Sequence, residues 1–161
     1  MDIDRKGIVF SLSAYLFWGF VPLYFKAVSH VTPLEVLAHR VVWAALFLAA
    51  LLFLQRRLGK TVKLLTRPRT VWAMLGCTAL VLLNWFSFIY AIGAGKTLEA
   101  SFGYFILPLF SIAIGFTVLK ERLTKTQFTA MFLATLGVLY QLVIMGKLPW
   151  IALTLAVTFS L

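Results

Sequence analysis

The chain has 161 residues, of which 62% are hydrophobic and only 12% are charged. With glycine counted in place of tyrosine the apolar share is about 65%, against about 45–50% in soluble domains, which argues against a soluble fold. Intrinsic disorder is excluded as well, because 16% of the residues are aromatic and a chain with so few charges can bury ample apolar surface. The net charge of +10 would indicate nucleic-acid binding in a soluble domain, so the positions of the charges have to be considered.

Five continuous apolar runs follow one another along the chain. They cover residues 8–28, 34–54, 71–92, 98–119 and 128–145. Each is about 18 to 22 residues long, enough for a helix to cross a bilayer. The runs lack the alternation of apolar and polar residues that is typical of transmembrane strands. A sixth run at 150–161 is too short to span. We therefore expect an all-α polytopic membrane protein with five transmembrane helices and a truncated sixth, divided into a five-helix unit at 1–146 and the start of the sixth helix at 147–161.

The basic residues are distributed unevenly between the two sides of this expected bundle. Eleven lie before the first run or in the second and fourth connections: Arg5, Lys6, Arg56, Arg57, Lys60, Lys63, Arg67, Arg69, Lys120, Arg122 and Lys125. Four lie towards the other side: Lys26, Arg40, Lys96 and Lys147. The positive-inside rule then places the N-terminus in the cytoplasm and accounts for the charge without nucleic acid. The second connection has a further possible use, contact with anionic lipid headgroups.

Two of the expected helices carry a narrow face of small, polar and aromatic residues at helical spacing. In the helix at 8–28 this face consists of Ser11, Tyr15, Trp18, Pro22 and Lys26. In the helix at 98–119 it consists of Ser101, Tyr104, Pro108, Ser111 and Gly115. Pro22 and Pro108 each remove a helical hydrogen bond and predict kinks. The freed carbonyls need either a neighbouring helix or a wet cavity, and both alternatives stay open.

The start of the helix at 34–54 combines a capping pattern with two residues that capping does not explain. Thr32, Pro33 and Glu35 form a capping-box pattern, which is a sufficient reason for the glutamate. His39 and Arg40 lie about one turn further into the membrane. Arg40 either snorkels to the interface or acts as a fixed cation for an anionic or polar substrate group, with His39 as a proton-linked partner.

The remaining polar residues are predicted to gather in the outer half of the bilayer. Asn84 and Trp85 lie well inside their run, and Glu99 stands in the first turn of the next, where a carboxylate also favours the helix dipole. On the predicted topology the outer half contains Lys26, Glu35, His39, Arg40, Asn84, Glu99, Ser101, Tyr104 and Gln141. The joint interpretation is a vestibule that leads towards the midplane, and the alternative is an ordinary outer interface with aromatic and basic anchors.

No pattern for catalysis, nucleotide binding or metal binding is present. The short GAGKT at 93–97 lacks the leading glycine and spacer of a phosphate-binding loop. The two histidines and the lone Cys77 do not supply a metal-ligand set, and a serine nucleophile would have only His39 as a base. We therefore expect neither an enzyme nor a cofactor.

Five stretches of the sequence together resemble a known family. They are FWGFVPLYFK from Phe17, AHRVVW from Ala38, NWFSFIYA from Asn84, LEASFGYFILPL from Leu98 and LKERL from Leu119. In order and spacing they resemble the first half of RarD-type permeases, in the EamA branch of the drug/metabolite transporter superfamily. Leu107 departs from the pattern, because relatives commonly have Asn before that proline, and one candidate polar contact is thereby lost.

The resemblance implies a ten-helix transporter made of two inverted five-helix repeats, with the substrate pathway between them. Related members move amino acids, metabolites or drugs, usually outward, and RarD-type proteins are named as chloramphenicol-resistance permeases. The residues of this chain that match recurring positions, and that we predict to line the pathway, are Trp18, Lys26, His39, Arg40, Asn84, Trp85, Glu99, Ser101 and Tyr104.

The prediction is accordingly a multi-pass permease of the cytoplasmic membrane that exports small organic solutes by alternating access. Its partners would be the lipid bilayer, a small-molecule substrate and a missing C-terminal five-helix half. A non-transporting membrane assembly protein is the rival from another class. A short antiparallel dimer of the small multidrug type is a second rival, but Lys26 stands where those transporters have an acidic residue, and the charge asymmetry argues against dual insertion.

Overall fold

A computed structural model describes residues 5–161, all of whose regular elements are helices. The helices are α1 (Arg5–Ala27), α2 (Pro33–Leu54), α3 (Leu58–Leu64), α4 (Pro68–Gly93), α5 (Thr97–Thr117), α6 (Lys125–Met145) and α7 (Trp150–Ser160). Five of them, α1, α2, α4, α5 and α6, are long and apolar enough to cross a membrane, and α7 is a shorter apolar helix. The predicted all-α class, with five spans and a short sixth apolar segment, is confirmed. The division at 146/147 stays a prediction.

The helices begin and end at local capping signals rather than at the limits of the apolar runs. α4 begins at Pro68, three residues before its run, because proline is favoured in the first helical turn. Thr124 and Gln127 form a complete capping box at the start of α6. Gly146 ends the same helix in the left-handed conformation, with φ of 59°, which glycine adopts without strain. The short α3 in the second connection is not predicted from the sequence, because seven residues are too few to establish a periodicity.

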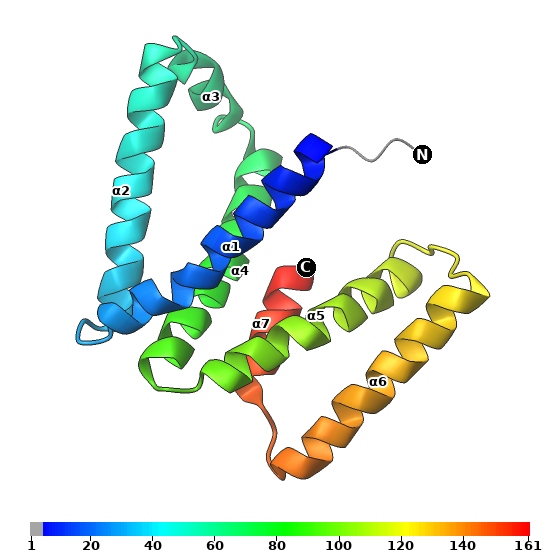
Figure 1. The fold of residues 1–161 in the computed structure, drawn as a ribbon. Helices are drawn as coiled ribbons and strands as arrows, with labels where there is room; N and C mark the ends of the chain where they lie inside the picture. Colours follow the sequence, from blue (N-terminus) through cyan, green and yellow to red (C-terminus); the bar gives the residue numbers. More distant parts are fainter. Residues whose placement is uncertain (1–4) are drawn as a thin grey trace.

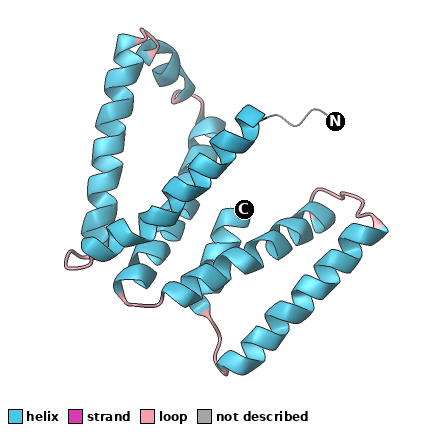
Figure 2. Ribbon diagram, viewed as in Figure 1, coloured by secondary structure: helices cyan, strands magenta, loops and turns pink. Residues whose placement is uncertain are grey.

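The spans run alternately up and down, and short loops join them (Figures 1 and 2). Figure 1 shows three connections at one end of the molecule: α1 to α2, α4 to α5, and α6 to α7. We call this the α1–α2 end. The N-terminus of α7 lies at that end, and α7 packs against both α4 and α5. α1 and α2 pack against α4, whereas α6 packs against α5.

The buried core lies where α1, α2, α4, α5 and α7 converge. Its larger cluster consists of Phe25, Val36, Leu37, Phe88, Ile89, Ala91, Ile92, Ala100 and Leu155. α5 and α7 approach each other closely: a Cβ added at Gly103 would lie 2.9 Å from the carbonyl oxygen of Ala152. Small residues permit such approaches between membrane helices.

Large apolar side chains are exposed along every span, for example Phe10, Phe47, Trp72, Phe105 and Val143. Soluble proteins rarely expose apolar surface on this scale to water, whereas membrane proteins expose it to lipid. These faces therefore fit a chain that uses the bilayer as its solvent.

Candidate functional site

An unbroken row of aromatic rings crosses from α1 through α4 to α5. The rings of Trp18 and Trp85 meet edge to face with centroids 5.8 Å apart. Trp85 meets Phe88 at 6.0 Å, and Phe88 meets Tyr104 at 6.0 Å. Phe25 packs against both Trp85 and Phe88. The structure thus brings together three of the predicted pathway residues, Trp18, Trp85 and Tyr104, and we call these five rings the aromatic row.

Arg40 lies on this row. Its Cζ atom is 3.8 Å from the centroid of the Trp85 ring and 5.6 Å from that of Phe25. A guanidinium at these distances is attracted by the negative face of an aromatic ring. Its Nη1 atom is buried and has no hydrogen-bond partner within residues 5–161. Arg40 therefore connects α2 to α4 through its contact with the Trp85 ring. Snorkelling to the interface alone does not require such a contact.

A pocket of about 390 Å³ lies beside Arg40 between the end of α1 and the start of α2. His39 and Arg40 line it together with Tyr24, Val36 and Trp43. The structure thus places His39 and Arg40 in the lining of a common pocket.

At the start of α2, one of the two hydrogen bonds of the predicted capping box is present. The hydroxyl of Thr32 accepts a hydrogen bond of 3.3 Å from the backbone N–H of Glu35. The reciprocal bond of a full capping box is found at α6 and not at α2 in the described chain. Glu35 and Lys26 are both exposed near this pocket's end of the molecule.

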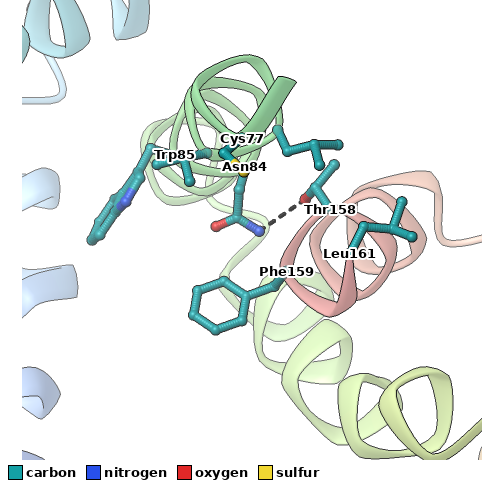
Figure 3. A pocket seen from close by; sticks show the side chains of 8 residues that line it. Cys77, Asn84, Trp85, Thr158, Phe159 and Leu161 are labelled. Carbon is teal, nitrogen blue, oxygen red and sulfur yellow. Dashed lines mark hydrogen bonds between the residues drawn. The ribbon is translucent and has the colours of Figure 1, made fainter. Parts of the chain in front are cut away.

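Asn84 serves the packing of α7. It is only 4% exposed, and its Nδ2 donates to the carbonyl oxygen of Leu155 at 3.1 Å and to the hydroxyl of Thr158 at 2.9 Å. Figure 3 shows the amide nitrogen turned towards Thr158 and the amide oxygen turned away from it. A second pocket of about 220 Å³ lies here, and Asn84 lines it with Cys77, Trp85 and Phe159 (Figure 3). Trp85 therefore supports Arg40 and also forms a wall of this pocket.

Glu99 also contacts α7 rather than the aromatic row. Its Oε1 accepts a hydrogen bond of 3.1 Å from the backbone N–H of Ile151, in the first turn of α7. The N-cap residue of α7, Pro149, makes no side-chain capping bond. The carboxylate supplies one acceptor for the unpaired N–H groups at that helix start. The Glu99 carboxylate thus accepts a hydrogen bond at the start of α7, and not at the start of its own helix.

The other predicted residues are not joined to these groups within residues 5–161. Lys26 and Ser101 are exposed and make no hydrogen bond to the aromatic row, and Gln141 is exposed on α6. Pro22 and Pro108 lie inside α1 and α5, both of which continue past them. Kinks at these prolines stay a prediction.

Sequence reasoning missed Phe25, Phe88, Tyr24 and Trp43. A usable signal existed, because Phe88 follows Trp85 and Trp43 follows Arg40 at a spacing of three, which places each pair on one helix face. The contribution of α7 carried no comparable signal.

Comparison with known proteins finds one matching family and several similar proteins. Residues 5–143 match the model of the EamA-like transporter family. An uncharacterized transporter of Vibrio cholerae is 45% identical over 97% of this chain and 52% of its own length. Protein RarD of Escherichia coli is 40% identical over 97% of this chain and 53% of its own length. The chloramphenicol-sensitive protein RarD of Pseudomonas aeruginosa is 34% identical over 99% and 54%, respectively. The chain thus spans about half the length of the curated relatives it matches. No solved structure matches it.

Proposed function

We propose that this chain, which belongs to the EamA-like transporter family, forms one half of a permease for small organic solutes, including drugs or metabolites. Family membership is the observation that carries the proposal. Five spans and a coverage of about half of each relative support two five-helix repeats, the second inserted in the opposite sense because five is odd. The two repeats would rock about a site near the midplane and expose it alternately to either side.

The aromatic row and Arg40 are the proposed contribution of this half to the pathway. Trp18, Trp85 and Tyr104 offer amphipathic surfaces for an organic solute, and Arg40 offers the charge. Lys26, His39 and Ser101 are also proposed as pathway residues, on the basis of their positions in the sequence. Asn84 and Glu99 would act on the pathway indirectly, through the helix that they hold.

The proposed orientation rests on the charges, and the choice of one transport probe rests on a relative. The excess of Lys and Arg at the end opposite the α1–α2 end supports a cytoplasmic N-terminus in the plasma membrane. One relative carries chloramphenicol sensitivity in its name. That name supports chloramphenicol as a transport probe, and export stays the direction proposed from the family resemblance.

The test is transport by the full gene product reconstituted in lipid vesicles. Labelled amino acids and chloramphenicol are offered on one side, and their appearance on the other is compared with that in protein-free vesicles. We expect transport of at least one probe and its loss in Arg40→Ala, with Arg69→Ala as an exposed control of the same charge at the opposite end. Transport unchanged by Arg40→Ala and by Glu99→Ala would contradict the proposed pathway.

One observation favours the rival function of a membrane assembly protein. Asn84 and Glu99 both direct polar groups at α7, which is what partner-helix packing requires. If that were the role of the whole polar set, no position in it would be open to water.

A further inference from the structure

Arg40 is a charge inside a membrane span. It is the eighth residue of α2, which places it about 10 Å from the start of the helix at a rise of 1.5 Å per residue. Ionised side chains at such depths are costly and almost always pair with another group or face a water-filled path. The question is therefore what balances the Arg40 charge.

No carboxylate of the described chain does so. Residues 5–161 contain three, Glu35, Glu99 and Glu121. Glu35 precedes Arg40 by five residues, which turns it by about 140° around α2. Glu99 is bonded to the start of α7, and Glu121 follows the far end of α5. The Nη1 atom of Arg40 has no hydrogen-bond partner within residues 5–161, and no ion pair of this side chain is found there.

The ring contacts orient the guanidinium without using most of its donors. The Cζ atom lies over the Trp85 ring, whereas the five N–H donors of a guanidinium all point outward in its plane. Nη1 is buried, so its donors are already shielded from solvent. A planar guanidinium with donors still unused matches the two oxygens of a carboxylate.

The pocket beside Arg40 has the size and the walls for an organic molecule. Its volume of about 390 Å³ lies in the range of roughly 300–1,000 Å³ that is usual for ligand sites. Tyr24 and Trp43 supply aromatic walls, and His39 stands beside the arginine with no acid in the lining. This lining is complementary to an anion with an apolar body.

We propose that Arg40 holds the carboxylate of an organic solute in this pocket, so that the site selects organic anions over neutral molecules of the same shape. The assignment rests on the proposed permease function and names its substrate class. An anionic lipid headgroup carries the same oxygen chemistry, so the test has to separate the two sources.

The experiment measures binding, independently of transport. The full gene product is placed in phosphatidylcholine nanodiscs and titrated with benzoate and with benzamide, its neutral counterpart, by ligand-observed NMR. We expect a preference for benzoate that falls about tenfold to a hundredfold in Arg40→Ala, as for the loss of a charge-assisted hydrogen bond. Arg40→Lys keeps the positive charge but loses the paired N–H donors of the guanidinium, so its preference for benzoate should lie between those of the unmodified protein and Arg40→Ala. If the alanine variant does not insert into the membrane, the comparison with Arg40→Lys tests the proposal. Arg69→Ala should bind as the unmodified protein does.

The outcomes separate the alternatives. Equal binding of benzoate and benzamide, or benzoate binding unchanged in both Arg40 variants, overturns the anion site and leaves the permease proposal intact. Arg40-dependent benzoate binding by a protein that transports no probe supports the site and contradicts the permease. If phosphatidylglycerol nanodiscs abolish the Arg40-dependent binding, the headgroup is the occupant and the solute assignment is wrong.

Discussion

The Glu99 carboxylate on α5 caps a helix that begins 51 residues later: its Oε1 accepts a 3.1 Å hydrogen bond from the backbone N–H of Ile151. The capped helix, α7, makes no side-chain capping bond of its own at Pro149. Together with the two bonds from Asn84, this contact holds α7 between α4 and α5.

Removal of the cap should loosen α7. Glu99→Ala should lower the free energy of unfolding by about 1 kcal/mol, the usual cost of a lost N-cap acceptor. Glu99→Gln keeps a side-chain acceptor and loses only the charge–dipole attraction, worth roughly 0.3–1 kcal/mol. Unfolding by SDS in mixed micelles, with hydrogen exchange at Ile151, measures both. Equal effects of the two variants would show that charge, and not the hydrogen bond, is what matters.

Loss of the Asn84 amide should have a similar but distinct effect. Asn84→Ala removes both bonds to α7, and interhelical bonds in membranes are worth on average about 0.6 kcal/mol each, so about 1 kcal/mol is expected. Thr158 stays satisfied, because its hydroxyl also donates to the carbonyl of Thr154 at 2.6 Å. Asn84→Asp retains the shape but offers no amide donor, and it should be at least as destabilising in the same SDS assay. Unchanged stability in both variants would contradict a packing role for this side chain.

The close approach of α5 and α7 depends on Gly103. Gly103→Ala places a methyl group 2.9 Å from the Ala152 carbonyl oxygen, where backbone has to move, so a loss of about 1–3 kcal/mol is expected. Gly137 on α6 is the matched control, because a Cβ there meets nothing within 4 Å. Gly137→Ala should be neutral or stabilising by up to about 1 kcal/mol through helix propensity. Thermal unfolding in detergent compares the two variants. Equal stability of Gly103→Ala and Gly137→Ala would contradict the close packing of α5 on α7.

Water access separates a transport pathway from an assembly surface. In a background without Cys77, cysteines at positions 104 and 105 are treated with a membrane-impermeant thiol reagent. Tyr104 is 40% exposed and belongs to the aromatic row, whereas Phe105 is 75% exposed on a neighbouring part of α5. A pathway predicts reaction at 104 and protection by lipid at 105, although 105 is the more exposed. Protection at both positions would favour the assembly protein.

Much of the fold was predictable from the sequence because its determinants are local. Five runs of apolar residues are long enough to span, and the basic residues divide unevenly between their connections. The start of α2 is indicated by Thr32, Pro33 and Glu35, which lie within four consecutive residues. The capping box at Thr124 was equally readable, although hydropathy alone placed the start of that helix at 128.

The partners of the polar side chains were decided only by tertiary structure. Asn84 and Glu99 look like pathway residues in the sequence, yet both bond to residues of α7 that lie 52 or more positions away. Arg40 looks like an interfacial anchor or a fixed cation, and its stacking on Trp85 follows from how α2 packs on α4. Hydropathy and capping act within one continuous segment of the chain, so the sequence by itself determines where helices form. The side-chain contacts depend on which helix faces meet, and that is settled only when the whole bundle packs.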